Sequence, residues 1–561
     1  MRKYLVLLII IFIGALLLRA VGISSFPVGF TQDEAGLGYD AYSLLLTGKD
    51  QWGKSFPLVL RSFGDFKMPL YSYLAIPSVY LFELNEFSVR FPNAILGSFA
   101  VLTTFLMVSK ITKRRELGLL SALFLAVSPW HIGLSRGAFE ANLTTFFIPL
   151  GVWAFVKGIS RPRFMVLAAT SFGLNLFSYH SARFFTPVLI LVLVWSYLKE
   201  LKQMGGNVQG AILSKYKWGL LIFGAFFALA IYTMFTGGAK RGLDITIFSP
   251  TDKWAAVSDR RYEATLQGLP DFYARIFSNK VSYVFETFSK NYLSYFSTSF
   301  LFSEGAGEFS YGMIPGRGVL YLFEAIFVLA AIFSFAKKEG FSKMGLLLLW
   351  ILVAPIPAAL TKGPGFAANR AAVMIPALQV ISAWGAVYLY EKLKSGYGNA
   401  LARAFLWGVL IILLGSLAGF LEDYRYHAPP RASKAMQYGM KDIMATINSI
   451  EGNYEGVVLS RTLSVPNIWV QFYMRLDPSE VQDASHVWLR YEKLGIKYLD
   501  QLNEYSLAKF TFGDIVINDL KDRNLLVVGR KEEFPVQTKP IASFNYLNGE
   551  GAYVLVDANE L

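Results

Sequence analysis

The stretch FPVGFTQDE at residues 26–34 sets the interpretation of the whole chain, because it follows directly on the first apolar run. Residues 4–23 are apolar apart from Arg19, and a run of that length can cross a bilayer. The stretch then places Asp33 and Glu34 where the chain leaves the membrane. Carboxylates beside a bilayer are costly to desolvate and are usually functional. The search for a functional site therefore starts at this acidic pair.

The composition is that of an integral membrane protein. Hydrophobic residues make up 54% of the 561 residues and charged residues only 17%, whereas about 25% charged residues is usual in soluble proteins. The mean hydropathy is +0.42. The chain has no cysteine, which excludes disulfides, thiolate catalysis and cysteine-ligated metals.

The net charge of +13 does not indicate a nucleic-acid partner. Lys and Arg gather at the ends of apolar runs, as the positive-inside rule requires, and no soluble segment shows a basic face with interleaved aromatic residues. The amino-terminal MRK followed by an apolar run resembles a secretory signal, but it lacks a small-residue cleavage site and is long enough to span. We therefore expect an uncleaved first helix.

Apolar runs of spanning length predict about eleven transmembrane helices. Some of the runs are short, so this count is good to within one or two helices. The runs lie near residues 4–22, 90–109, 117–135, 139–157, 164–180, 183–198, 218–235, 318–336, 344–360, 371–391 and 404–421.

Clusters of Lys and Arg fall on every second loop between these runs, and this alternation orients the chain. The loops that carry them are predicted to be cytoplasmic, with the amino terminus inside and the chain crossing the cell (inner) membrane many times. Asp33, Glu34 and the carboxy-terminal segment are then extracytoplasmic. The clusters are Arg2-Lys3; Lys110, Lys113, Arg114 and Arg115; Lys157, Arg161 and Arg163; Lys199, Lys202, Lys215 and Lys217; Lys337, Lys338 and Lys343; and Lys392, Lys394 and Arg403.

Two long external loops are predicted. The first loop, residues 24–88, includes an apolar, tyrosine-rich stretch at 69–84 that is short and carries two prolines. Such a stretch suits a helix in the membrane interface better than a crossing, so we expect the first loop to lie along the membrane surface. The second loop, residues 236–317, is dense in aromatic residues. This favours a cap that lies on the membrane over a cofactor site, although the same surface could hold a lipid tail or an acceptor.

Residues 428–561 have the pattern of a separate domain. Apolar residues recur at helical spacing between Ala435 and Ile447. Strand-like runs follow, the last two joined as a hairpin through NGEG: 456–460, 512–517, 525–528, 542–546 and 552–556. A segment of this size with mixed helix and strand suits one small α/β or α+β domain. The chain is therefore divided into a membrane domain at 1–427 and an extracytoplasmic α/β domain at 428–561.

Several nucleotide and metal motifs are absent from the sequence. The chain contains no GxxxxGK[ST] P-loop, no HExxH and no DxD motif, and its four histidines are scattered. This excludes a P-loop ATPase and argues against a multi-histidine metal site. It also removes the metal–nucleotide clamp of many soluble sugar transferases.

Charged residues gather instead at the predicted outer ends of the helices. Any one of them is more often a snorkelling or ion-paired side chain than a catalytic one, but together they surround the acidic pair with cations on one side of the membrane. Such an arrangement suits an anionic lipid headgroup and a reaction in which a phosphate leaves. The residues are Arg19, Asp65, Lys67, Arg90, Arg136, Glu140, His180, Arg183, Lys362 and Arg370.

Four motifs, taken in order, resemble the membrane glycosyltransferases of the GT-C fold. They are TQDEAGLGYDAYSLLLTG at 31–48, KMPLYSYL at 67–74, EFSVRFPNAILG at 86–97 and LSRGAFE at 134–140. The chain looks most like the bacterial branch related to protein O-mannosyltransferases and aminoarabinose transferases, of glycosyltransferase family 39/83 type. The resemblance covers about residues 1–190 and continues more weakly at PGRGVLY (315–321) and ANR (368–370).

The resemblance implies transfer of a sugar from a polyprenyl-phosphate donor to an acceptor hydroxyl on the outer face, with inversion and without a nucleotide. It assigns Asp33 as the general base, while Glu34 orients Asp33 or binds a divalent metal. Metal dependence stays open, because some relatives carry an acidic residue where this chain has Phe66. The expected partners are membrane lipids, the donor, and a protein, lipid or glycan acceptor. The candidates for binding the donor phosphate are Lys67, Arg183, Lys362 and Arg370.

A membrane transporter or lipid flippase is the alternative class. Transporters place polar groups and broken helices near the bilayer midplane. Here the predicted spans hold few ionisable residues, with Glu324 the main exception, and no inverted repeat is visible. A non-catalytic scaffold that displays its outer domain is a third possibility, but it would leave Asp33 and the surrounding cations without a role.

Overall fold

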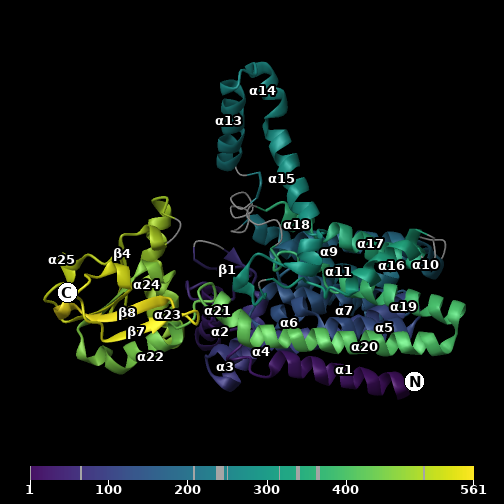
Figure 1. Ribbon diagram of the computed structural model, residues 1–561, viewed down its shortest axis with the longest axis horizontal. Coiled ribbons are helices and arrows are strands. Elements are labelled where there is room, and N and C mark those ends of the chain that lie inside the picture. The colour runs from purple at the N-terminus through teal and green to yellow at the C-terminus, as the bar shows by residue number, and fades with distance from the viewer. Residues whose placement is uncertain are drawn as a thin grey trace.

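The computed structural model describes residues 2–63, 66–205, 209–235, 246–248, 250–314, 316–336, 341–361, 367–496 and 499–561. Figure 1 shows a long helical bundle with a sheet-containing domain at one end and a helical hairpin that projects from the side of the bundle. We call the end of the bundle beside the sheet the domain end.

The bundle consists of helices that bury apolar faces against one another. They are α1 (Arg2–Ala20), α4 (Glu86–Thr112), α5 (Arg115–Val127), α6 (Pro129–Arg136), α7 (Thr144–Gly158), α8 (Arg163–Asn175), α9 (His180–Ser196), α11 (Gln209–Thr233), α16 (Glu324–Ala336), α17 (Phe341–Val353), α19 (Ala377–Tyr397) and α20 (Asn399–Glu422). Trp130 and Trp350 are fully buried in the core that these helices share. Each of the eleven predicted apolar runs overlaps at least one of these helices.

The number of membrane crossings is not established by helix length. Among the described residues, five stretches are long and apolar enough to cross a membrane, and α5 with α6 forms a sixth candidate that is bent by 57°. Other predicted spans form helices of 13 to 17 residues, which reach about 20–25 Å against a hydrocarbon core of about 30 Å. The five long stretches are Arg2–Ala20, Glu86–Thr112, Ser214–Thr233, Ala372–Tyr397 and Asn399–Ala432.

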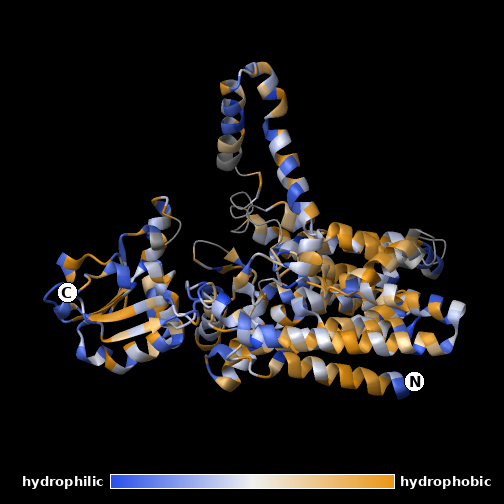
Figure 2. Cartoon of the chain, in the orientation of Figure 1, coloured by the Kyte–Doolittle hydropathy of each residue, from blue (hydrophilic) through white to orange (hydrophobic). Residues whose placement is uncertain are grey.

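The two ends of the bundle differ in charge. Figure 1 places the amino terminus, α10 (Leu198–Gly205) and the turn between α19 and α20 at the end away from the sheet. These are sites of the predicted basic clusters. Figure 2 shows hydrophobic residues along α1 and α20, with hydrophilic residues at the amino terminus and over much of the sheet domain. The loops with basic clusters named above therefore lie at one end of the bundle, and the sheet domain lies at the other.

The carboxy-terminal segment contains a sheet domain of six strands in the order β4-β5-β3-β6-β8-β7. The central strand β3 is parallel to β5 and β6, and the other pairs are antiparallel. The strands are β3 (Gly456–Ser460), β4 (Glu504–Leu507), β5 (Phe510–Gly513), β6 (Leu525–Gly529), β7 (Ala542–Asn545) and β8 (Gly551–Asp557), and the larger helices are α22 (Met440–Ile450), α23 (Pro466–Tyr473) and α24 (Pro478–Lys493). The strand predicted at 512–517 lies earlier in the chain, as β5 at Phe510–Gly513. It ends before Asp514, whose carboxylate pairs with Arg461.

The first loop forms α2 (Gln32–Thr47), β1 (Leu60–Arg61), β2 (Phe66–Lys67) and α3 (Leu70–Phe82). α2 starts with a capping box between Thr31 and Glu34 and ends at Gly48 in a left-handed conformation. The prediction that this loop lies along the membrane surface is wrong for α2, which is mostly buried. It suits the exposed apolar side chains of the described part of the loop, among them Phe56, Tyr80 and Leu81.

The first loop and the sheet domain share one hydrophobic core. The rings of Phe30 and Phe472 lie 4.9 Å apart, and the Tyr39 hydroxyl donates to the Leu476 carbonyl at 2.8 Å. The contact is so close at Gly29 (φ +73°) that a Cβ atom there would lie 2.2 Å from the Met436 carbonyl oxygen. The sheet domain therefore covers α2 together with α3 of the first loop.

The second loop forms a helical hairpin of α13 (Pro250–Leu266), α14 (Asp271–Phe277) and α15 (Lys280–Ser294). It returns to the bundle through η3 (Ser299–Ser303) and η4 (Phe309–Tyr311). In Figure 1 the hairpin extends crosswise to α1 and α20, and it leaves the bundle toward the domain end.

Candidate functional site at the domain end

Asp33 lies in the first turn of α2 and is the accessible member of the acidic pair. Its Oδ1 atom is 2.8 Å from Lys67 Nζ, and the side chains of Asp33 and Lys67 are 41% and 8% exposed. Lys67 comes from β2 and also donates to the Asp33 carbonyl at 3.3 Å. The ring of Phe63 packs closely on α2 at Gly36, where a Cβ atom would lie 3.2 Å from the ring, and Lys67 Nζ lies 5.3 Å from the centre of that ring. The structure thus brings together a half-exposed carboxylate and a buried cation.

Glu34 is held in the opposite environment, fully buried beside Arg90. Their side chains form an ion pair at 2.8 Å with no exposed area on either one. The Glu34 carboxylate also accepts from the backbone N–H of Ala138 at 2.9 Å and of Thr31 at 3.1 Å. Every contact ties Glu34 to a different part of the chain, so this carboxylate fixes where α2 begins.

Arg90 extends the same network to the segment before α2. Its guanidinium donates to the backbone carbonyls of Ile23, Pro27 and Gly29 at 2.7–3.1 Å. A buried charge of this kind is stable only when its donors are paired. The loop that carries Asp33 is therefore held by a cation from the bundle helix α4.

Arg136 and Arg19 bind the carboxyl ends of helices. Arg136 donates to the carbonyls of Leu18, Val21 and Phe26. Arg19, which is fully buried, donates to the carbonyls of Leu125 and Ala126 and to His131 Nδ1. Carbonyls at the end of a helix lack partners within it and attract cations.

His180 and Arg183 lie at the start of α9, next to the strand that carries Lys67. His180 Nε2 donates to the Phe66 carbonyl at 2.9 Å, which fixes β2. Arg183 donates to the Leu176 carbonyl at 3.1 Å and to Thr233 Oγ1 at 2.8 Å. The structure thus places His180 against the residue next to Lys67, whereas Arg183 binds Leu176 and Thr233.

Arg370 reaches the site from the other half of the chain. It donates to Thr361 Oγ1 at 2.8 Å and lies 4.0 Å from the carboxylate of Glu308. Burial raises the pKa of Glu308, and the charge of Arg370 opposes that rise. Asp65 and Lys362, two further predicted site residues, lie outside the described residues.

Tyr311 connects these groups and was not predicted from the sequence. Burial raises the pKa of Tyr311 well above its ordinary value, and the negative charges of Asp33, Glu308 and Glu140 raise it further. Its ring meets that of Phe139 at 5.4 Å, edge to face. The second loop therefore folds back beside the first, and its GEFSYG segment (307–312) is the sequence signal that marks the contact.

A second acidic pair lies two helical turns beyond Asp33 and was also missed. Asp40 and Asp50 are both buried. Burial, and then the charge of Asp50, raise the pKa of Asp40 well above its ordinary value, and burial raises that of Asp50. Their oxygens accept from backbone N–H groups at residues 51, 52 and 54 at 2.9–3.2 Å.

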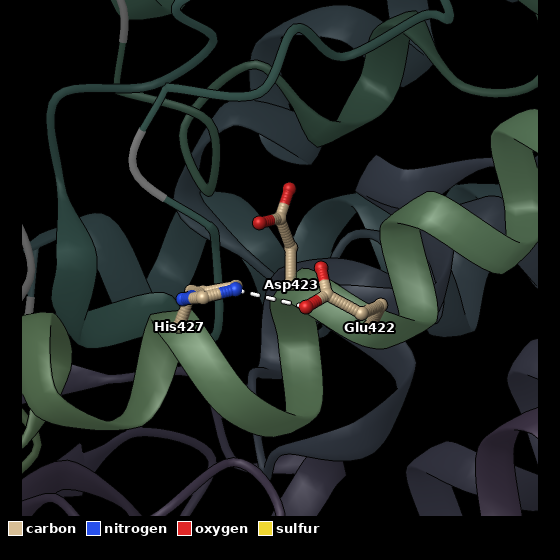
Figure 3. Close-up of side chains that lie close together, drawn as sticks. All are labelled: Glu422, Asp423 and His427. Atoms are coloured by element: carbon tan, nitrogen blue, oxygen red, sulfur yellow. Dashed lines mark hydrogen bonds and ion pairs between the residues drawn. The ribbon is translucent and has the colours of Figure 1, made fainter.

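Within the described part of the chain, one group of three side chains has its ligand atoms close enough together to hold a metal ion. It comprises Glu422, Asp423 and His427, at the end of α20 (Figure 3). His427 Nε2 is 2.8 Å from Glu422 Oε1, and Asp423 pairs with Arg317. These ligand atoms are thus already engaged with protein partners, and Asp33 and Glu34 are not in the group.

The comparisons with known proteins confirm the predicted resemblance. The sequence model of the family described as dolichyl-phosphate-mannose-protein mannosyltransferase matches residues 67–214. ArnT from Cupriavidus metallidurans in the apo state is similar in fold, with a TM-score of 0.55 at 10% identity over 98% of both chains. A second structure of that protein, bound to undecaprenyl phosphate, gives a TM-score of 0.49 at 10% identity over 100% of this chain and 98% of that one.

A relative in sequence is an uncharacterized protein of Aquifex aeolicus (strain VF5). It is 28% identical over 197 residues, which is 32% of this chain and 39% of the relative. The match thus spans well under half of that protein. The family match and the shared fold together support the class of membrane glycosyltransferase.

Proposed function

We propose that this chain transfers a sugar from a polyprenyl-phosphate donor to an acceptor hydroxyl at the domain end of the bundle. The observation that carries the proposal is the contrast within the acidic pair: Glu34 is saturated by buried donors, whereas Asp33 is half-exposed beside Lys67. A rigid backbone thus presents one accessible carboxylate. The description of the matched family as a dolichyl-phosphate-mannose transferase supports a lipid-phosphate donor.

In the proposed reaction Asp33 is the general base. Its carboxylate takes the proton of the acceptor hydroxyl, and the acceptor oxygen forms a bond to the anomeric carbon of the sugar. The bond from that carbon to the phosphate oxygen breaks on the opposite face, and the electron pair leaves with the polyprenyl phosphate. Attack opposite the leaving group inverts the anomeric centre.

The departing phosphate needs cations, and the candidates come from separate elements. Lys67 is the nearest to Asp33, while Arg183 and Arg370 approach from α9 and from the segment before α19. Lys362 is the remaining candidate from the sequence. Preorganised cations stabilise a developing phosphate charge more strongly in a water-poor site than in bulk water.

Glu34 acts in this proposal as a positioning residue. Its oxygens already accept from Arg90, Thr31 and Ala138, so the contacts favour orientation of Asp33 over metal binding. A divalent metal stays an alternative, and full activity in excess chelator would exclude it. By the positive-inside rule, the domain end and the sheet domain face the extracytoplasmic side of the cell membrane.

The acceptor class is open among protein hydroxyls, lipids and glycans. Lipid extracts from cells with and without the gene, compared by mass spectrometry, would identify a lipid acceptor or an accumulated donor. A change in glycosylated protein with unchanged lipids would indicate a protein acceptor.

The test of the proposed function is Asp33→Asn in membranes supplied with a radiolabelled polyprenyl-phosphate sugar. Removing a general base typically lowers turnover by about 10²–10⁴-fold, and we expect a loss in that range with unchanged expression. Asp271→Asn is the matched control, because Asp271 is an exposed carboxylate paired with Arg275 in the distant hairpin. Full transfer by Asp33→Asn would overturn the mechanism.

A further inference from the structure

The helical hairpin of α13, α14 and α15 exposes an apolar surface that the described chain does not cover. Large exposed side chains gather at its tip: Phe272, Tyr273, Ile276 and Phe277. Exposed apolar patches of this kind usually mark an interaction surface. The hairpin runs crosswise to the bundle helices (Figure 1), and this direction helps to identify what covers the surface.

The apolar side chains of α15 form a stripe along one face. Val281, Phe285, Phe288 and Tyr292 recur at intervals of four, three and four residues, which places them on one side of a helix. Val281 is 77% and Phe285 72% exposed. Phe288 and Tyr292 are partly buried, so the stripe is open mainly in its outer half.

The opposite side of α15 carries charged residues, although exposed Leu293 also lies there. Glu286 forms an ion pair with Arg260 of α13 at 2.6 Å, and exposed Lys290 follows one turn later. An amphipathic helix with charges on one face and aromatic residues on the other is typical of a segment in a membrane interface.

The base of the hairpin is fixed to the bundle. Asn291 donates to the carbonyls of Ala359 and Thr361 at 3.1 and 3.2 Å, and the Tyr292 hydroxyl donates to the Leu352 carbonyl at 2.8 Å. Leu352 belongs to α17 and is itself half-exposed. The stripe on α15 therefore continues onto the outside of the bundle.

We propose that this hairpin lies on the membrane, with the stripe of α15 in the boundary between lipid headgroups and acyl chains. Helices that cross a bilayer run along its normal, so a hairpin that leaves them crosswise runs parallel to the membrane plane. It leaves toward the domain end, where an aromatic belt is expected. The same reasoning holds whichever side of the membrane that end faces.

The absence of cysteine from the chain makes a direct test possible. Phe285→Cys and Lys290→Cys each introduce a single thiol on opposite faces of α15, and each is labelled with an environment-sensitive fluorophore. The labelled full-length proteins are placed one chain per nanodisc in phosphatidylcholine and phosphatidylglycerol, with nitroxide quenchers at known depths in the acyl chains. Val281→Cys is the second stripe position, in case Phe285→Cys impairs folding.

We expect a blue-shifted emission at position 285 and quenching about threefold or more stronger than at 290, greatest for shallow nitroxides. Equal quenching at the two positions, or no quenching at 281 and 285, would overturn the proposal. Absence of quenching at both 281 and 285 would instead favour a protein partner for the stripe. The readout is independent of sugar transfer, so failure of the proposed function would not affect it.

Discussion

The first and second loops belong to the same end of the bundle but differ in what they bury and what they expose. The first loop buries charge: Glu34 and Arg90 are paired without any exposed area. The second loop exposes apolar surface, with Val281 and Phe285 mostly accessible. A buried charge needs fixed partners from several elements, whereas an apolar surface needs only lipid. The difference separates a rigid site scaffold from a proposed membrane-binding arm.

The largest effect on stability should come from breaking the buried ion pair of the first loop. Arg90→Ala leaves Glu34 buried without its cation, and such a loss costs about 3–5 kcal/mol. Thermal unfolding in detergent should show a large drop in melting temperature. Arg260→Ala, which removes the exposed pair with Glu286 in the second loop, should cost less than about 1 kcal/mol. Equal effects of the two changes would contradict the comparison.

A second contrast lies in two aromatic residues. Phe30 is almost fully buried against the sheet domain, so Phe30→Ala should cost about 3–5 kcal/mol of unfolding free energy. Phe285→Ala removes an exposed ring and should change stability in detergent by about 0.5 kcal/mol or less. Denaturant titration of both variants measures the difference. A large loss in Phe285→Ala would mean that protein covers the stripe.

Two glycines with positive φ sharpen the contrast further. Gly29 (φ +73°) contacts the Met436 carbonyl so closely that Gly29→Ala must displace backbone, whereas Gly268 (φ +85°) has open space around it. We expect Gly29→Ala to destabilise by about 2–3 kcal/mol or more and Gly268→Ala by only about 1 kcal/mol of backbone strain. If limited proteolysis released the sheet domain equally from both variants, the shared core would not depend on this contact.

The last comparison concerns pH and the buried acids of the first loop. Because its pKa is raised in the folded protein, Asp40 binds a proton more tightly there than when unfolded, so stability falls as pH rises from the unfolded pKa through the folded one. Asp40→Asn mimics the protonated form, and its melting temperature should fall less over this rise in pH. An unchanged pH profile would show that Asp40 is not a source of the dependence.

The sequence reveals the acidic pair but not that one carboxylate is accessible and the other buried. Asp33 and Glu34 are adjacent, yet Asp33 contacts Lys67 whereas Glu34 contacts Arg90 and Ala138. These contacts arise from folding and cannot be read from the spacing of the residues. Tyr311 was missed for the same reason, because its approach to Asp33 depends on how the second loop returns to the bundle.

The parts of the fold that depend on local sequence pattern were predicted best. Apolar runs predicted the bundle helices, and β-branched runs predicted β3 and β6. The number of crossings was less predictable, because several apolar runs form helices too short to span alone. The burial of α2 could not be read from its own residues, since part of its cover comes from α23 and α24, more than 400 positions later in the chain.

This shared core has a consequence for how the protein is made. The helix that carries Asp33 emerges early from the ribosome, but Phe472, which covers it, follows more than 400 residues later. At a synthesis rate of about 5–20 residues per second this delay is roughly 20–90 s. During that time α2 is exposed to chaperones and proteases, and a prematurely terminated chain would be inserted but left with an open amino-terminal loop.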